Sequence, residues 1–588
     1  MSETGLRNAP NEDTFASPLV IAVTGHRDLV ADEVPGIRSR VRDLFRELVE
    51  RYPERKLQLY SPLAEGADRL VAEEALSLGV ELHVVLPMPE ELYLRDFSSP
   101  ESKACFRALA DRAAGCCALP FARGVGGDEV VRSERARGIQ YAQLGVFLCA
   151  HCHILLALWD GKPSTQLGGT GQIVRFHHDN IMPGFSGATV ASQQMLVDDE
   201  SDLVYHIVCS RDRPGGAPRP DLQPLDWWWF TKDREHPLSK ELPRQHQLIF
   251  RRSGEFSEDS LRYSAQIDRD KYPLLNDRET EFLPPGIDNI NRLFCIADWL
   301  AIHFQKRTLL SLRTTHLLAF LMGFMFLLYD DLRAWQYLMY AFLFFFVIAA
   351  TVQIVAKKQG WHRKYLDYRT LAEGLRVQFY WAAASVTNDT VSKYTHDHFL
   401  QSQDPELGWI RNVMRVAGTR CDMESASHPE GVTFAIREWI GDAASGQLGY
   451  FRKKSIERIA RNRNTDRLAR FSLLASVAVV GVMIIAGSGL PNSTLSLLQV
   501  FMGTTLLLFG VRQGYAHSTA EKELIKQYEF MLRIFHNARR RLDHADDDME
   551  RRQILRALGG SALDEHAEWI LMHRDRSPDQ GEIWRMGS

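Results

Sequence analysis

The sequence has few cysteines, eight among 588 residues, and they are irregularly spaced. Small secreted domains that depend on disulfides are much richer in cysteine, which excludes a disulfide framework as the basis of this fold. The run CAHCH at 149–153 has metal-like spacing, but no second Cys/His pair follows nearby to complete four ligands. We therefore predict no metal site, and no motif in the chain calls for a cofactor.

A strong overall charge is also lacking. Lysine and arginine total 70 against 74 aspartate and glutamate, which gives a net charge of −4. This balance provides no general attraction to nucleic acid, and we expect no direct nucleic-acid partner. The polar first 18 residues lack the apolar stretch of a signal peptide, so none is predicted.

Charge is entirely absent from a few long windows, at 314–329, 334–356 and 471–511. A membrane-spanning helix needs roughly 20 apolar residues. The last window is too long for one helix and contains the turn-forming sequence GSGLPNST. The windows therefore predict two transmembrane hairpins of two spans each, and a lipid bilayer as a partner.

The distribution of positive charge predicts the orientation of these hairpins. Lysine and arginine flank their outer ends and are almost absent from their short turns. Because positive charge is retained on the cytoplasmic side, we expect a multi-pass protein of the inner (cell) membrane with both termini in the cytoplasm. The uncharged windows contain no Asp, Glu, Lys or Arg, which argues against a charge-coupled transporter.

The N-terminal part, residues 17–235, alternates between strand-like and helix-like segments. Apolar runs such as LVIAVTG, VELHVVLP and HILLALW are separated by stretches with helical spacing. This alternation predicts a Rossmann-like α/β fold, a doubly wound parallel sheet with helices on both faces. Ligands of such sheets bind beyond the carboxyl ends of the strands.

Three loops at predicted strand ends combine glycine with charge: TGHRD, AEGADR, and WDGK with the following GGTG. Glycine lets a backbone approach a ligand closely, and backbone N–H groups at a helix start bind phosphate. We expect the loops to form one pocket for a nucleotide-derived ligand. The candidate ligand-binding residues are Gly25, His26, Arg27, Glu65, Gly66, Asp68, Arg69, Asp160, Gly161, Lys162, Gly168, Gly169, Thr170 and Gly171.

The motifs VTGHRD, AEGADRLVAE and LLALWDGKPSTQLGGTG resemble, in this order, those of the SLOG family. That family is the Rossmann-like superfamily of the DNA-processing protein DprA and the cytokinin-activating LOG enzymes. The segments YRTLAEGLRVQFYW and ALDEHAEWILMHRDR are similar to SLATT proteins, the SLOG-associated two-transmembrane effectors. The resemblance implies a bacterial conflict or antiviral-defence system in which the SLOG domain senses or processes a nucleotide-derived ligand and the membrane module is the effector.

The chain departs from LOG-type hydrolases at one place. Those enzymes carry glutamates directly after the glycine-rich motif, whereas Gly171 is followed here by Gln172, Ile173 and Val174. A glutamine cannot act as a general base. No catalytic residue is assigned, and binding is favoured over hydrolysis. A membrane-tethered hydrolase or glycosidase that uses Glu65 or Asp68 stays open, as does a non-catalytic membrane scaffold.

Two further features carry weaker expectations. The sequence DWWWF at 226–230 is too short to span a membrane. We expect it to pack the N-terminal domain against the membrane part or to lie at the membrane interface. His177 and His178 follow the glycine run and are expected in an exposed turn. The C-terminal helices are expected to mediate homo-oligomers.

Together these patterns predict a ligand-gated membrane effector, in which the bound signal gates or assembles the transmembrane helices as an ion channel or pore. The expected parts are a flexible tail (1–16), a SLOG-like domain (17–235), a connector (236–308), hairpin 1 (309–359), a cytoplasmic helical region (360–468), hairpin 2 (469–513) and a helical tail (514–588).

Overall fold

The structure is a computed structural model that describes most of the chain in two compact units. The described residues are 17–122, 124–185, 202–231, 238–275, 283–284, 286–331, 336–386, 399–400, 405–422, 429–486 and 489–575. Unit 1 comprises residues 1–296 and 371–432, and unit 2 comprises residues 297–370 and 433–588. The predicted tail, 1–16, lies outside the described residues.

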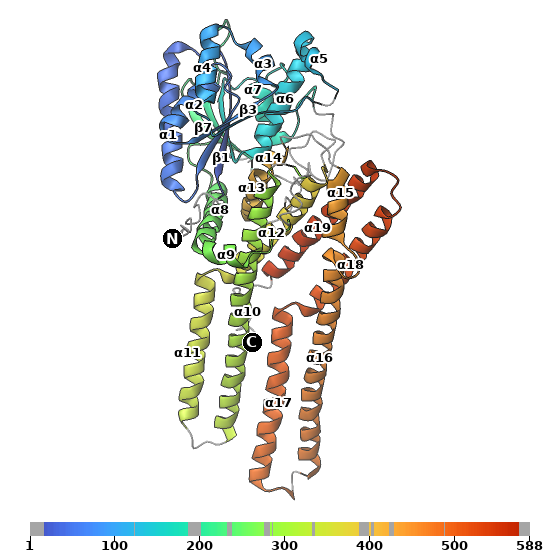
Figure 1. Ribbon diagram of the computed structural model, residues 1–588. Helices are drawn as coiled ribbons and strands as arrows, with labels where there is room; N and C mark the ends of the chain where they lie inside the picture. Colours follow the sequence, from blue (N-terminus) through green and yellow to red (C-terminus); the bar gives the residue numbers. More distant parts are fainter. Residues whose placement is uncertain are drawn as a thin grey trace, which may run out of the picture. The chain divides into compact units, whose positions relative to one another are not determined.

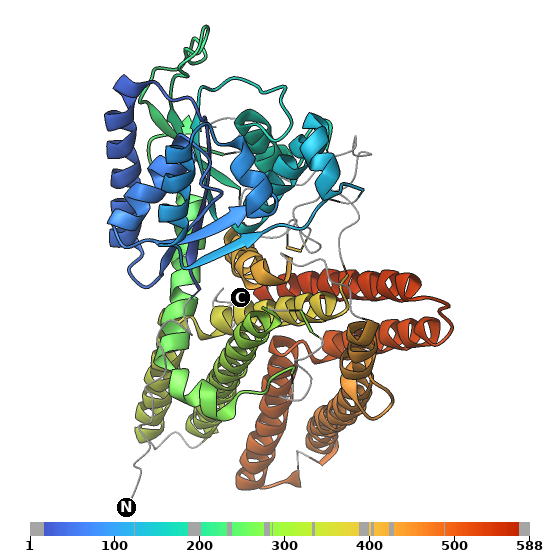
Figure 2. The same ribbon diagram turned by 45° about the horizontal axis from the view of Figure 1, so that its top comes forward.

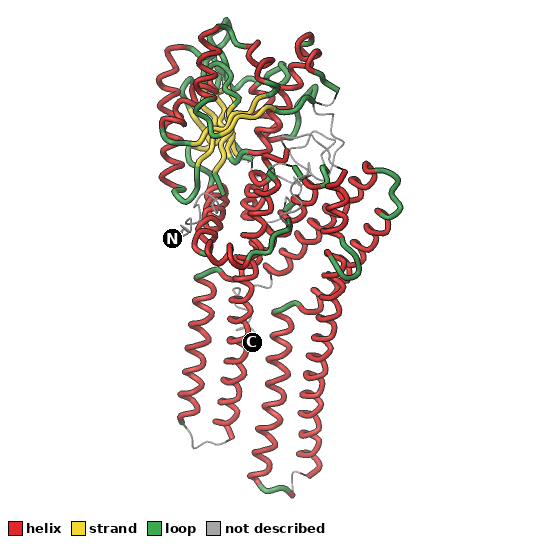
Figure 3. Tube along the Cα trace, in the orientation of Figure 1, coloured by secondary structure: helices red, strands yellow, loops and turns green. Residues whose placement is uncertain are grey.

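Unit 1 contains an eight-stranded sheet in the order β4-β3-β2-β1-β5-β6-β7-β8. The sheet is drawn in yellow in Figure 3. The strands are β1 (Leu19–Gly25), β2 (Leu57–Ser61), β3 (Glu81–Leu86), β4 (Gly115–Ala118), β5 (Ile154–Trp159), β6 (Leu203–Val208), β7 (Trp227–Phe230) and β8 (Leu238–Ser239). The first six strands pair in parallel. The predicted parallel, Rossmann-like fold is confirmed.

Helices cover both faces of this sheet, as Figures 1 and 2 show. They include α1 (Val34–Arg51), α2 (Ala67–Ser77), α3 (Glu90–Tyr93), η3 (Leu94–Asp96), α4 (Pro100–Ala110), α5 (Gly127–Arg132), α6 (Glu134–His151) and α7 (Thr170–Asp179). Successive side chains of a strand point to opposite faces. Val20 and Ala22 of β1 belong to the core formed with α6 and α7, while Leu19, Ile21 and Val23 are equally buried. This explains why β1 is apolar at every position from Leu19 to Val23 rather than at alternate ones.

The tryptophan cluster belongs to the sheet, which corrects the expectation for DWWWF. Residues 227–230 form β7, which pairs antiparallel with β6. Trp229 is 1% exposed, and its ring lies 4.8 Å from that of Tyr205 on β6. Aromatic residues suit a pleated, half-buried surface. The run therefore extends the sheet beyond its parallel part, within unit 1.

A distant segment of the chain completes the core of unit 1. Helix α13 (Gly408–Ala417) presents backbone carbonyls to the CAHCH run: the carbonyl of Asn412 lies 3.0 Å from His153 Nε2, and that of Arg415 lies 2.7 Å from His151 Nδ1. Nδ1 of His153 also accepts the N–H of Val20. These histidines are buried hydrogen-bonding groups of the core, and the described residues contain no cluster of metal ligands.

Most of the other described elements are helices, and some of these are predicted to span a membrane. The other helices include α8 (Arg244–Arg262), α9 (Ser264–Asp270), α10 (Ile287–Asp331), α11 (Tyr337–Lys358), α12 (Trp361–Ala383), α14 (Thr419–Asp422), α15 (Pro429–Ala435), η6 (Ile436–Ile440), α16 (Gly446–Ala486), α17 (Asn492–Ser518), α18 (Glu521–Leu542) and α19 (Asp548–Asp575). Four helical stretches, beginning at Ile287, Tyr337, Gly446 and Asn492, are long and apolar enough to cross a membrane. These four stretches are consistent with a multi-pass membrane protein.

Helices α10 and α17 of unit 2 approach each other closely at two glycines. A Cβ atom added to Gly323 would lie 2.7 Å from Leu507, and one added to Gly503 would lie 2.8 Å from Leu327. Small residues allow this reciprocal approach, and in lipid such packing is a main source of helix association. The predicted hairpins thus contact each other through α10 and α17.

Candidate ligand-binding site

The predicted loops lie where the sheet reverses its strand order. The chain proceeds from β1 outward to β4 and then returns to place β5 on the other side of β1. Such a switch point opens a crevice at the carboxyl ends of the two adjacent strands, here Gly25 and Trp159. Ten of the fourteen candidate residues lie between the end of β1 and the loop after it, or between the end of β5 and the start of α7.

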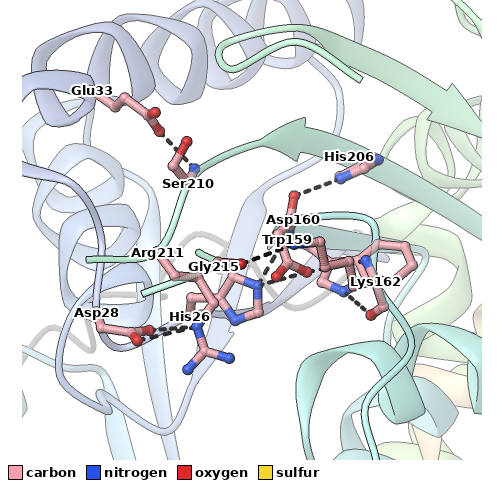
Figure 4. Close-up of polar contacts among 10 residues, drawn as sticks. All are labelled: His26, Asp28, Glu33, Trp159, Asp160, Lys162, His206, Ser210, Arg211 and Gly215. Atoms are coloured by element: carbon pink, nitrogen blue, oxygen red, sulfur yellow. Dashed lines mark hydrogen bonds and ion pairs between the residues drawn. The ribbon is translucent and has the colours of Figure 1, made fainter. Parts of the chain in front are cut away.

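His26 and Asp160 meet at this switch point, both buried (Figure 4). Nε2 of His26 lies 3.1 Å from the backbone N of Asp160 and 3.2 Å from its Oδ1. A neutral ring accepts the N–H, whereas a protonated ring donates to the carboxylate. Burial would raise the pKa of Asp160, but His26 and the N–H of Lys162 stabilise the carboxylate and hold its pKa below the ordinary value.

The rest of the β5 loop is fixed by contacts within unit 1. Gly161 has a φ of +77°, and a Cβ there would lie 2.4 Å from Leu222. The ammonium of Lys162 donates to the Gly215 carbonyl at 3.0 Å, and Trp159 Nε1 donates to the Lys162 carbonyl at 2.9 Å (Figure 4). The ammonium of Lys162 is therefore hydrogen-bonded to the loop that follows β6.

The glycine run 168–171 packs closely against the protein itself. Cβ atoms added to Gly168, Gly169 and Gly171 would lie within 2.8 Å of Tyr141, of Ser164 and of the Lys162 carbonyl, respectively. This close approach brings the start of α7 to the β5 loop. Its first two N–H groups, those of Thr170 and Gly171, have no acceptor among the described residues. Unpaired N–H groups at a helix start are suited to an anion.

Gln172 has a structural role inside this loop. Its side chain is 6% exposed, and its Oε1 accepts the N–H of Gly168 at 3.2 Å. The glutamine thus closes the glycine run onto the first turn of α7. Gln172, which cannot act as a general base, thus supplies a hydrogen-bond acceptor to the backbone of the glycine run.

Arg27 is exposed and is held by a row of hydrogen bonds. Its Nη2 donates to the hydroxyl of Tyr141 at 3.0 Å, and its guanidinium lies 5.5 Å from the centre of that ring. Tyr141 in turn donates to Asp96, whose carboxylate also accepts from Nε of Arg137 at 2.9 Å. The positive charge of Arg27 is therefore held at the hydroxyl end of Tyr141, whose Cβ, at the other end of the side chain, packs against Gly168.

The β2 loop is packed directly against the β1 loop. Gly66 has a φ of +81°, and a Cβ there would lie 2.3 Å from the Arg27 carbonyl oxygen. Gly25 is similarly close to Ala67, whose N–H donates to the His26 carbonyl at 3.1 Å. Both glycines are therefore required by close backbone approach, which is one of the physical uses of glycine at turns.

Glu65, the first carboxylate of the β2 loop, accepts hydrogen bonds from two serines. Its Oε1 accepts from both the N–H and the hydroxyl of Ser98, at 2.9 and 2.8 Å, and from the hydroxyl of Ser102. Although burial acts to raise the pKa of Glu65, these hydrogen bonds lower it. A carboxylate stabilised in this way is a poor general base.

Asp68 is a contrasting carboxylate in the same loop. It is 5% exposed, and its Oδ1 has no hydrogen-bond partner in the described part of the chain. Burial raises the pKa of Asp68 to about 7, although Arg27, the Ala64 N–H and Arg69 oppose the rise. Arg69 is engaged by the Leu63 carbonyl at 3.0 Å and by Ser102 at 2.8 Å, and its guanidinium lies over Phe97.

Several residues of the candidate site were not predicted from the sequence. Tyr141, Asp96 and Arg137 lie on helices, outside the glycine loops that gave the signal. Arg211, which pairs with Asp28 at 2.8 Å (Figure 4), follows β6 in the sequence SRDRPGG. That loop carries the same combination of glycine and charge after a predicted strand, so the same criterion would have found it.

His177 and His178 correct an expectation. They lie in α7 and are 0% and 5% exposed, with the His178 ring 4.6 Å from that of Phe230. They occupy the buried face of an amphipathic helix, because the apolar spacing of α7 continues through them. The predicted exposed turn begins only at Asn180, which has left-handed backbone geometry.

Comparison with known proteins assigns no family to this chain. The chain matches no protein-family model, and no curated protein matches it.

Proposed function

We propose that unit 1 binds a nucleotide-derived anion at the switch point between β1 and β5, and that binding controls the membrane helices of unit 2. The observation that carries the proposal is the start of α7. Among the described residues, the N–H groups of Thr170 and Gly171 at the helix N-terminus have no acceptor, and the exposed guanidinium of Arg27 is hydrogen-bonded to Tyr141, whose Cβ packs against Gly168. Phosphate is the anion that such N–H groups and arginine commonly bind together.

The link to the membrane helices rests on chain continuity. Helices α10 and α12 each contain residues of both units, because the division falls at 296/297 and 370/371. A ligand shifts a conformational equilibrium only if it binds one state better than the other. In our proposal, the SLOG-like unit is the sensor and the SLATT-like helices open or assemble, as homo-oligomers, to permeabilise the inner membrane, with both termini in the cytoplasm. The setting is bacterial antiviral defence.

The test uses the full-length protein in detergent and in dye-loaded liposomes. AMP, ADP, ATP and ADP-ribose are measured for binding by calorimetry, with adenosine as the uncharged comparison. Arg27→Ala should weaken the phosphate-bearing ligands roughly tenfold or more, since it removes a charge-assisted hydrogen-bond donor. Arg46→Ala, an exposed arginine on α1, is the matched control and should change nothing.

The liposome arm separates the candidate functions. Dye release that depends on a bound nucleotide, with the nucleotide recovered intact, supports the sensor. No binding to any of the four nucleotides would contradict the proposal. Turnover of a nucleotide without dye release would favour the second candidate, a membrane-tethered hydrolase. The observation in favour of that candidate is Asp68, whose raised pKa of about 7 suits proton transfer near neutral pH.

A further inference from the structure

Tyr141 connects the two anion-binding elements of the site, although it belongs to neither. It lies on α6, 114 residues away from Arg27 in the chain, and its hydroxyl accepts from Arg27 Nη2 at 3.0 Å. At its other end, its Cβ lies 2.7 Å from where a Cβ of Gly168 would be. One side chain therefore touches both the arginine and the glycine run that leads to the N–H groups of Thr170 and Gly171, for which the described residues offer no acceptor.

The direction of each hydrogen bond around Tyr141 is determined by its partners. A phenol has one proton to donate. Arg27 can only donate and the Asp96 carboxylate accepts, so the Tyr141 proton points to Asp96 and its lone pair faces Arg27. Tyr141 stays a phenol at neutral pH, because burial raises the pKa of its hydroxyl, although Arg27 opposes the rise.

The far end of this row is anchored to the backbone. Arg137 holds Asp96 through Nε at 2.9 Å, and its Nη2 and Nη1 donate to the carbonyls of Leu92 at 2.7 Å and Val130 at 3.3 Å. The side chains of Arg137, Asp96 and Tyr141 are all largely buried or half-buried. Such a supported row restricts the rotamers of a long, exposed arginine, which otherwise loses side-chain entropy when it binds a ligand.

We propose that Tyr141 is a positioning residue for ligand binding, which orients Arg27 toward the anionic group of the ligand and fixes its place relative to the start of α7. This inference rests on the proposed function and adds the residue that sets the geometry of the site. Tyr141 touches Arg27 rather than the ligand, so its effect passes through that arginine. Removal of its hydroxyl should therefore matter only while Arg27 is present.

The test is a double-mutant cycle in the full-length protein, with ADP and ADP-ribose as probes and adenosine as the uncharged comparison. Tyr141→Phe should weaken the binding of both phosphate-bearing probes by roughly three- to tenfold, the effect of one hydrogen bond. In the Arg27→Ala background the same change should have no effect. Binding of adenosine should be equal in all four proteins.

The matched control is Tyr93→Phe. The hydroxyl of Tyr93 is buried in the same region, beside Asp68 and Tyr141, and has no hydrogen-bond partner within the described ranges. Its removal should leave the affinity for both probes unchanged. If Tyr141→Phe does not fold, as judged by its thermal unfolding, Asp96→Ala replaces it, because loss of Asp96 frees the Tyr141 hydroxyl and should give the same weakening.

Three outcomes would overturn the inference and leave the proposed function intact: normal affinity in Tyr141→Phe, equal weakening with and without Arg27, or equal weakening in Tyr93→Phe. Absence of binding by the wild-type protein to either phosphate-bearing probe would overturn both. A loss that appears only with phosphate-bearing probes and only with Arg27 present supports the inference, because a purely structural role would weaken adenosine as well.

Discussion

The buried carboxyl of Asp68 gives the sharpest quantitative prediction. Its side chain is 5% exposed and its Oδ1 has no hydrogen-bond partner among the residues that the structure describes, so the ionised form is poorly stabilised. Burial raises its pKa from 3.8 to about 7. Asparagine has nearly the same shape and cannot ionise, and its amide oxygen can still accept the Ala64 N–H. Asp68→Asn therefore removes the titration and keeps most of the contacts.

The pH dependence follows from the proton balance. Between pH 3.8 and about 7 the folded chain retains a proton on Asp68 that the unfolded chain has lost. Stability therefore falls as pH rises through this window and is constant above it, as far as Asp68 is concerned. At about 1.4 kcal/mol per pH unit, the whole window corresponds to ~4 kcal/mol. Wild type bears this cost at pH 8, and the variant does not.

The assay is thermal unfolding of the full-length protein in detergent from pH 4 to pH 8. Asp68→Asn should unfold at about the wild-type temperature at pH 4. At pH 8 it should unfold roughly 8–16 °C higher, since each kcal/mol shifts the midpoint of a large domain by about 2–4 °C. Asp179→Asn, whose side chain is 55% exposed, is the control. A difference between Asp68→Asn and wild type that is the same at every pH, or that favours wild type as pH rises, would refute the reasoning.

Two further predictions use pairs of glycines as matched tests. Gly79→Ala should destabilise unit 1 by about 1–2 kcal/mol, because Gly79 has a positive φ. Gly66→Ala should cost well over that amount in thermal unfolding, because Gly66 also has a positive φ and its Cβ would lie 2.3 Å from the Arg27 carbonyl oxygen. Equal losses in the two variants would mean that the close approach of the β1 and β2 loops is unimportant. Gly503→Val should lower the unfolding temperature and alter dye release from liposomes, because its Cβ would lie 2.8 Å from Leu327, whereas Gly510→Val on the same helix meets nothing within 4 Å. If the two variants behave alike, the α10–α17 contact is not what holds the hairpins together.

The sequence alone determined the elements whose signal is local. A fully apolar run such as LVIAVTG specifies a strand buried on both faces, and uncharged windows of about 20 residues specify helices suited to a membrane. Glycine with charge after a strand likewise marked the loops that the fold brings to one edge of the sheet. These properties depend on neighbours a few residues away, so they can be predicted from the sequence.

Only the tertiary structure decided which distant segments meet. Tyr141 contacts Arg27 across 114 residues, and α13 supplies carbonyls to His151 and His153 from more than 250 residues away. Helical spacing places Tyr141 on a helix face but does not say what that face contacts. The same limit applies to DWWWF, whose aromatic residues fit a strand and a membrane interface equally well until a pairing partner, β6, is known.

The glycine run shows both kinds of information in one place. Its composition indicated a chain that must approach something closely, because glycine is the residue without a side chain to prevent it. The structure shows that Gly168, Gly169 and Gly171 approach the protein itself, and that the N–H groups of Thr170 and Gly171 have no acceptor among the described residues. Local sequence specifies the need for close approach, whereas long-range packing decides what is approached.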